Sequence, residues 1–169
     1  MLLSLFIAPW AGALVAGEQR FPQKHSIVGL TIPDDWTWRN DDARSSFARD
    51  KGNTFGIYMY HLTDQMDLDG GVKFYEGFLR KFAKEGENKI VSTKAPAEVK
   101  VAGFAARRLE MISGDVLGGL LRDVVVVFSP KRGVVLALHG TALKPAVDKN
   151  EKRFSAIVDS VRLLPSNVR

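Results

Sequence analysis

One segment near the middle of the chain has the spacing of acidic residues that comes closest to a metal-binding motif. It matches the calcium-loop template D-x-[DN]-x-[DN]-G-x5-E at Asp67, Asp69, Gly70 and Glu76. The first position of the template is Gln65 instead of a carboxylate, and Lys73 places a cation at the ninth position. We therefore expect Asp67 or Asp69 to cap a helix by accepting hydrogen bonds from its free N–H groups. A calcium-stabilised module that uses Asp67, Asp69 and Glu76 is the alternative.

The histidines and the loop carboxylates are the candidates for general acid–base chemistry. His61 and His139 each end an apolar strand, so a hydrogen-bonded imidazole at a strand end is the simplest expectation. Four carboxylates lie in two short loops: Asp34, Asp35, Asp41 and Asp42. A small periplasmic hydrolase that uses these carboxylates and a histidine is an alternative function. It requires His61 or His139 within hydrogen-bond reach of an aspartate in a pocket.

Several other classes of site are missing from the sequence. It has no cysteine, which excludes disulfides, thiolate catalysis and cysteine-based metal sites. It also has no G-x-S-x-G nucleophile elbow, no phosphate-binding glycine loop and no dinucleotide fingerprint. We therefore expect no cofactor.

The net charge of +5 is unevenly distributed along the chain. Residues 1–86 hold 10 Lys and Arg against 11 Asp and Glu, whereas residues 87–169 hold 14 against 8. A basic second half is typical of a solubilising surface, because its bases are scattered singly, and an anionic partner or membrane surface is the alternative. The candidate binding residues lie in or next to its strands: Arg107, Arg108, Arg122, Lys131 and Arg132. Basic and aromatic residues do not alternate as in single-strand binders, so we expect no nucleic acid.

The first 17 residues carry no charge and predict export. An apolar run followed by small residues is typical of a secretory signal, and it is too short to span a bilayer, which takes about 20 apolar residues. Cleavage after Ala13 or after Gly17 fits the small-residue rule. No Lys or Arg precedes the run, so an uncleaved anchor, a start further upstream and a buried N-terminal element stay as alternatives. We expect one domain over residues 18–169, in the periplasm or secreted.

Two amphipathic helices are predicted. Residues 70–85 form the first, with Gly86 as a left-handed terminating residue. Its apolar stripe is Val72, Tyr75, Phe78, Leu79 and Phe82. The second begins with Asp148, which together with Glu151 forms a capping-box pattern.

The remaining pattern is one of strands. Residues 88–93, 97–101 and 104–111 predict three strands, and 120–128 and 134–139 predict a hairpin whose turn is 129–133. The first strand of that hairpin is almost continuously apolar, as suits a strand that is buried on both faces. Hairpins dominate and βαβ alternation is absent, so the fold class is α+β, with helices packed on a mainly antiparallel sheet.

Three stretches resemble the PsbP/Mog1-like superfamily, including its bacterial DcrB-like members. Residues 29–36 are similar to its opening strand, which ends in a proline and then a tryptophan. Residues 101–110 resemble its central strand, and 122–162 its closing hairpin and helix. The resemblance rests on the order and spacing of these stretches along the chain.

The resemblance implies an α-β-α sandwich around an antiparallel sheet and no shared enzymatic activity. Members act by binding, as photosystem II accessory subunits, as a partner of the Ran GTPase, as chaperones for secreted effectors or as envelope proteins. Together with the export segment, this predicts a non-enzymatic accessory or protein-binding domain of the bacterial cell envelope. Its partner would be an envelope protein that docks on a sheet face or edge.

Overall fold

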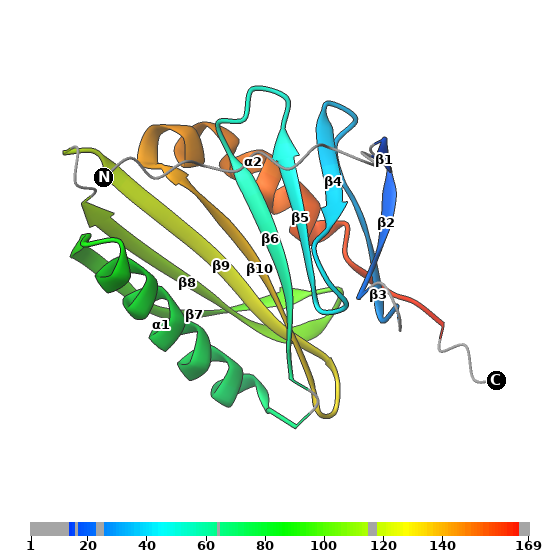
Figure 1. The fold of residues 1–169 in the computed structure, drawn as a ribbon. Helices are drawn as coiled ribbons and strands as arrows, with labels where there is room; N and C mark the ends of the chain where they lie inside the picture. The colour runs from blue at the N-terminus through cyan, green and yellow to red at the C-terminus, as the bar shows by residue number, and fades with distance from the viewer. Residues whose placement is uncertain (1–13, 16, 23–25, 64, 115–117, 166–169) are drawn as a thin grey trace.

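An eight-stranded antiparallel sheet forms the centre of the protein (Figure 1). The computed structural model describes residues 14–15, 17–22, 26–63, 65–114 and 118–165, so most of the predicted export segment lies outside the described residues. In spatial order, the strands are β1 (Leu14–Val15), β4 (Trp36–Asn40), β5 (Ser45–Asp50), β6 (Gly56–Thr63), β10 (Val134–Leu143), β9 (Leu120–Lys131), β8 (Phe104–Gly114) and β7 (Lys89–Val101).

Two helices and a small second sheet cover the large sheet. The small sheet has the order β11 (Arg162–Leu163), β3 (Val28–Thr31) and β2 (Glu18–Phe21). The helices are α1 (Leu68–Glu85) and α2 (Lys144–Asp159). They lie on opposite faces of the large sheet, α2 on the same face as the small sheet (Figure 1). The predicted α+β, α-β-α architecture is confirmed.

Strand β9 is buried on both faces, as its apolar sequence predicts. Val124 and Val126 belong to the core under α2, whereas Val125 and Val127 belong to the core under α1. Burying a valine side chain stabilises the fold by about 1.5–3 kcal/mol relative to leaving it exposed. The strand therefore joins the two cores.

The turn of this hairpin is shorter than predicted. Strand pairing continues to Lys131 and Val134, so that only Arg132 and Gly133 connect the strands. Gly133 has φ +76°, a conformation that glycine adopts without steric cost.

Helix α2 begins four residues before the predicted start. Its N-cap is Leu143, which offers no side-chain hydrogen bond, and a proline stands in the first turn. The capping-box prediction was wrong because Asp148 and Glu151 bind Arg122 of strand β9 instead.

Helix α1 has the predicted cap and a different end. Asp67 is the N-cap, and its carboxylate accepts a hydrogen bond of 2.7 Å from the N–H of Gly70, so this prediction is confirmed. Gly86 has φ −81°, and the left-handed conformation belongs to Glu87 (φ +57°). The left-handed residue thus follows one position later than predicted.

Strand β7 unites two of the predicted strands. The predicted break at 94–96 is an irregularity in the pairing with β8 between Lys94 and Ala97. Pro96 lacks an N–H, which an edge strand tolerates because its outer edge has no neighbour to receive it.

Helix α1 covers only part of its sheet face. It packs on β7, β8 and β9 and on the side chains of Val135 and Ala137 in β10. In β6, Ile57 and Met59 point to the other side and are 1% exposed, whereas Tyr58 and Tyr60, on the α1 side, are only half-buried. Within the described residues, the α1 side of β4, β5 and β6 is therefore open.

An ion-pair cluster around Arg122, which we call the clamp, holds α2 against the sheet. The guanidinium of Arg122 contacts Asp148 at 2.7 Å, Glu151 at 2.6 Å and Glu110 at 3.0 Å. Burial alone would raise the pKa of Glu110 and of Glu151, but hydrogen bonds from cationic side chains outweigh it and lower both pKa values. The clamp therefore favours the ionised carboxylates.

Replacing Arg122 by methionine tests this clamp. We expect Arg122→Met to lower the free energy of unfolding at neutral pH by about 2–3 kcal/mol, because Glu110, Asp148 and Glu151 each lose one of their cationic partners. In the parent protein, the contribution of Glu110 and Glu151 is lost as the pH falls through their lowered pKa values, below the ordinary 4.5. The variant loses part of that acid-dependent step, because Lys94 and Arg108 still bind Glu110 and Arg108 still binds Glu151.

Urea unfolding followed by tryptophan fluorescence, at neutral pH and near pH 3, measures both effects. The control is Arg107→Met, since Arg107 pairs with the exposed Glu98 and its loss should cost less than about 0.5 kcal/mol. Equal stability losses for the two variants would contradict the clamp.

Candidate binding surface

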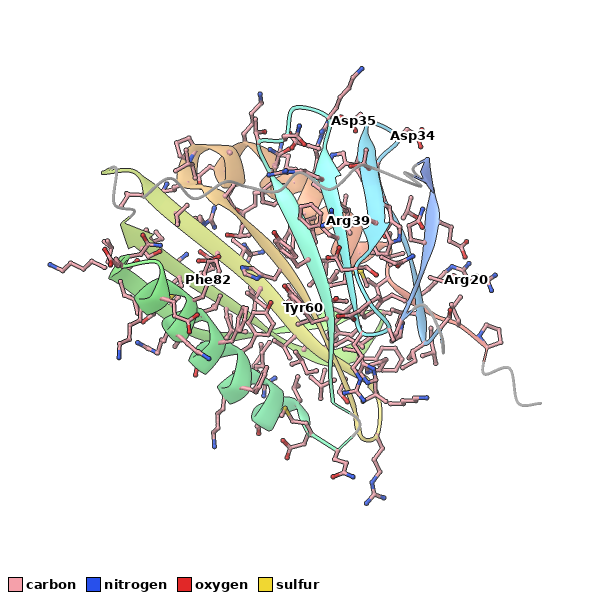
Figure 2. The ribbon with its side chains drawn as sticks, viewed as in Figure 1. Arg20, Asp34, Asp35, Arg39, Tyr60 and Phe82 are labelled. Carbon is pink, nitrogen blue, oxygen red and sulfur yellow. The ribbon has the colours of Figure 1, made fainter. Side chains whose placement is uncertain are left out.

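A row of aromatic side chains crosses the open part of the sheet and continues onto α1. We call it the aromatic face, and its members are Phe47, Tyr58, Tyr60, Phe74, Phe78 and Phe82. Ring centroids of successive neighbours are 4.5 Å apart for Phe47 and Tyr58, 6.0 Å for Tyr58 and Tyr60, 6.3 Å for Tyr60 and Phe78, and 6.2 Å for Phe78 and Phe82. Figure 2 labels Tyr60 near the middle of this row and Phe82 towards the end of α1.

The periodicity of each element produces this row. Side chains alternate between the faces of a strand, so β5 and β6 send Ala48, Ile57 and Met59 into the core under α2 and the intervening aromatics to the other side. On α1, the aromatics recur every four residues and share one flank of the helix. Large exposed apolar patches mark sites of interaction.

The helix buries Val72, Tyr75 and Leu79 of the predicted stripe but not Phe78 and Phe82. Tyr75, Leu79 and Ala83 lie in the core, whereas Phe78 is 37% exposed and Phe82 is 53% exposed. The prediction that Phe78 and Phe82 belong to the core stripe was wrong because Ala83 takes the position that faces the sheet.

A hollow of about 480 Å³ opens at the β5 end of the row, and we call it the arginine hollow. Its lining consists of Phe47, Arg49, Asn53, Thr54, Phe55, Gly56, Tyr58, Thr141, Ala142, Leu143, Pro145 and Ala146. Among the described residues of this lining, Arg49 is the single charged side chain. At Gly56 a Cβ atom would lie 2.6 Å from the ring of Phe47, so the missing side chain leaves room for that ring.

A second hollow, of about 250 Å³, lies between α1 and β6. Aromatic and aliphatic side chains line it together with four polar residues: Asp42, Arg44, Ser45 and His61. Hydrogen bonds from the N–H of Arg44 (2.6 Å) and from the Ser45 hydroxyl lower the pKa of Asp42. The serine thus bonds the carboxylate directly instead of through an imidazole, so these groups do not form a Ser-His-Asp relay.

Burial also keeps Tyr60 neutral. It raises the pKa of Tyr60 to about 12, with smaller contributions from Tyr58, Asp41 and Asp42. Tyr60 is therefore a neutral phenol, able to donate a hydrogen bond, at any physiological pH.

The hydrolase alternative requires a histidine that is hydrogen-bonded to an aspartate and lies in a pocket. His139 meets the first of these requirements but not the second. His139 Nε2 lies 2.8 Å from Asp123 Oδ1, but these side chains are only 5% and 4% exposed. The rings of Tyr58 and Tyr75 lie against the imidazole, and neither partner lines one of the hollows described above. The prediction that His139 ends its strand was wrong, because this residue lies within β10. A substrate has no route to this pair within the described structure.

The loop carboxylates do not converge on one cleft. Asp34 and Asp35 line a third hollow, of about 650 Å³, and Asp35 pairs with Arg153 at 2.9 Å. Asp41 pairs with Arg39 at 2.7 Å, and Asp42 belongs to the hollow beside α1.

The acidic residues of the calcium alternative are also apart. Asp67 caps α1, Asp69 lies in its first turn, and Glu76 lies on the flank that faces β7 and β8. Within the described residues, no group of three or more His, Asp or Glu side chains is placed to hold a metal ion.

The predicted basic residues are distributed over three places. Arg108 and Arg122 meet in the carboxylate cluster under α2, and Arg107 pairs with Glu98 at 3.1 Å. Lys131 and Arg132 lie at the turn between β9 and β10, at the other end of β9 from Arg122. The structure thus brings together two of the five, and their role in binding stays a prediction.

Comparisons with known proteins bear on the fold. No protein-family model matches the sequence, and no curated protein matches it. Solved structures do match. PsbP (CyanoP) from Synechocystis sp. PCC 6803 has a TM-score of 0.62 at 13% identity, over 94% of this chain and 99% of that chain. The chain therefore has a PsbP-like fold.

Two further solved structures share this PsbP-like fold. LpqN of Mycobacterium tuberculosis, which is involved in cell envelope biogenesis, has a TM-score of 0.56 at 16% identity, over 89% of this chain and 91% of LpqN. A Bacteroides thetaiotaomicron protein has a TM-score of 0.57 at 11% identity over 88% of this chain, which spans about half (49%) of that protein. Among the described helices, none has the length and apolar character needed to cross a membrane.

Alanine substitutions on α1 test whether the aromatic flank is surface. We expect Phe82→Ala to lower the free energy of unfolding by less than about 1 kcal/mol, because its ring is half exposed. Leu79→Ala, in the same helix and 3% exposed, should cost about 2–5 kcal/mol. Urea unfolding measures both, and a cost for Phe82→Ala equal to that of Leu79→Ala would show that the flank is packed.

Proposed function

We propose that this protein is an exported, non-enzymatic binding domain of the bacterial cell envelope, and that it docks a protein partner on the aromatic face. The continuous aromatic row is the observation that carries this proposal. Tyrosine, phenylalanine and arginine are enriched in the centres of protein interfaces, where they supply most of the binding energy. The aromatic face has this composition, with Arg49 beside Phe47.

The titratable groups support binding over catalysis. The Asp123–His139 pair is buried, Asp42 is held by a turn and by the Ser45 hydroxyl, and Asp35 is paired with Arg153. A catalytic carboxylate or imidazole needs access to substrate and a pKa suited to proton transfer. Asp123, His139, Asp42 and Asp35 are engaged in contacts of the fold instead.

Export and an envelope location rest on the uncharged N-terminal segment, and the fold shared with LpqN supports them. Strand β1 adds a constraint on processing. Leu14 and Val15 pair with Trp38 and Thr37 of β4, so cleavage after Ala13 would keep β1 and cleavage after Gly17 would remove it.

Site-specific photocrosslinking in the native host tests the docking surface. We expect a crosslinker in place of Phe82, which is 53% exposed, to capture one defined envelope protein. The matched control is Val91 on the β7 edge, which is 58% exposed and should not capture the same protein. With the crosslinker at Phe82, Phe78→Ser should reduce the captured amount at least tenfold, because it removes a central ring of the row.

Two results would count against the proposal. One is capture of the same protein with equal yield from Val91. The other is capture from Phe82 that Phe78→Ser leaves unchanged while the variant retains the parent's urea midpoint.

A further inference from the structure

We propose that the arginine hollow anchors a carboxylate of the docked protein, which pairs with Arg49 while neighbouring apolar side chains of the same segment lie on Phe47 and Tyr58. This inference rests on the aromatic face as the docking surface. It adds the chemistry of the partner, which is an apolar segment that carries an acidic group.

The charge of Arg49 acts within the fold only over longer distances, on the ring of Phe47 and on Asp50. Its guanidinium lies 5.8 Å from the ring centroid of Phe47, and it makes no ion pair with a carboxylate of the described residues. Arg39 lies at a similar distance from the same ring (5.6 Å) but is paired with Asp41 at 2.7 Å. Two arginines thus flank the ring of Phe47, and the N–H donors of Arg49 are not bound by a carboxylate of the described residues.

The carboxylate of the adjacent Asp50 does not pair with Arg49, because it accepts hydrogen bonds within its own turn. Asp50 Oδ1 accepts hydrogen bonds from the N–H groups of Thr54 (2.7 Å) and Phe55 (2.9 Å), and Oδ2 accepts one from the Thr54 hydroxyl (2.7 Å). Burial opposes ionisation of Asp50, but these bonds outweigh it and lower its pKa. The carboxylate therefore stays in its own turn.

The hollow suits a carboxylate on an apolar segment. Its volume of about 480 Å³ falls within the usual range for ligand pockets, about 300–1,000 Å³. Aromatic and aliphatic walls lower the local dielectric, which strengthens a charged hydrogen bond. The planar guanidinium matches a carboxylate with two parallel N–H···O bonds.

Continuity with the aromatic face favours a protein segment over a free anion. Phe47 and Tyr58 line the hollow and also begin the aromatic row, so a segment held at Arg49 can continue along the row. The hollow at the other end of the row has the carboxylate of Asp42 in its lining. A nucleic acid needs cations along its whole track, so this charge pattern disfavours it.

Small-molecule probes test the preference directly. In ¹H–¹⁵N NMR titrations of the purified protein, we expect 3-phenylpropionate to shift the amide signals of Phe47, Tyr58 and Thr141. The neutral 3-phenylpropanol should bind at least fivefold more weakly and the cationic 3-phenylpropylamine more weakly still. Arg49→Gln should weaken 3-phenylpropionate binding about tenfold, because hydrogen bonds to charged groups are lost. The paired Arg39→Gln control should change it less than twofold.

Several outcomes overturn the inference. These are equal binding of the acid, alcohol and amine, shifts confined to another part of the protein, equal effects of Arg49→Gln and Arg39→Gln, and a single-stranded oligothymidylate that binds the same residues more tightly than 3-phenylpropionate. Loss of the carboxylate preference with intact crosslinking at Phe82 would remove this inference alone. Failed crosslinking with an intact preference would leave a carboxylate site and remove the docking proposal.

Discussion

The close approach of helix α1 to strand β10 determines which part of the sheet stays open. At Gly71 a Cβ atom would lie 2.6 Å from a methyl carbon of Val135, so the first turn of α1 reaches the strand only because it has no side chain there. From this contact the helix runs over β9, β8 and β7 (Figure 1) and buries Tyr75 and Leu79. The strands β4, β5 and β6 are left without a helix on this side, and their aromatic side chains meet those on the flank of α1.

Most of the ion pairs and side-chain hydrogen bonds described above stabilise the fold. The carboxylates of α2 hold Arg122, a carboxylate caps α1, and the Asp123–His139 pair lies under Tyr75. Buried polar groups are tolerated when they are paired, and they are then poorly placed to react. Among the described residues, the aromatic face and Arg49, which has no ion pair there, form the surface that we propose for binding.

Local patterns were predictable from the sequence, and long-range ones were not. The burial of β9 on both faces follows from its unbroken apolar run, and the Asp67 cap follows from the residues beside it. The capping box at Asp148 failed because its carboxylates pair with Arg122, which lies 26 residues away in sequence from Asp148. The exposure of Phe78 and Phe82 depends on which strands α1 covers, and no local pattern specifies that.

The aromatic face likewise combines local patterns that the sequence shows with a long-range arrangement that it does not. The alternation of Tyr58 and Tyr60 and the four-residue spacing of Phe74, Phe78 and Phe82 are visible in the sequence, and two apolar stripes on one helix could have indicated a surface flank. Their assembly into one row depends on tertiary packing, which likewise separates Lys131 and Arg132 from Arg122.

Hydroxyl-radical footprinting of the native complex tests the docking claim most directly, because it reads the exposure of each aromatic side chain. We predict that oxidation of Tyr58, Tyr60, Phe78 and Phe82 falls severalfold in the complex compared with the free protein, while Val91 and Leu163 are unchanged. Unchanged oxidation of the four aromatics, with protection at the β7 edge or at the turn between β9 and β10, would contradict it.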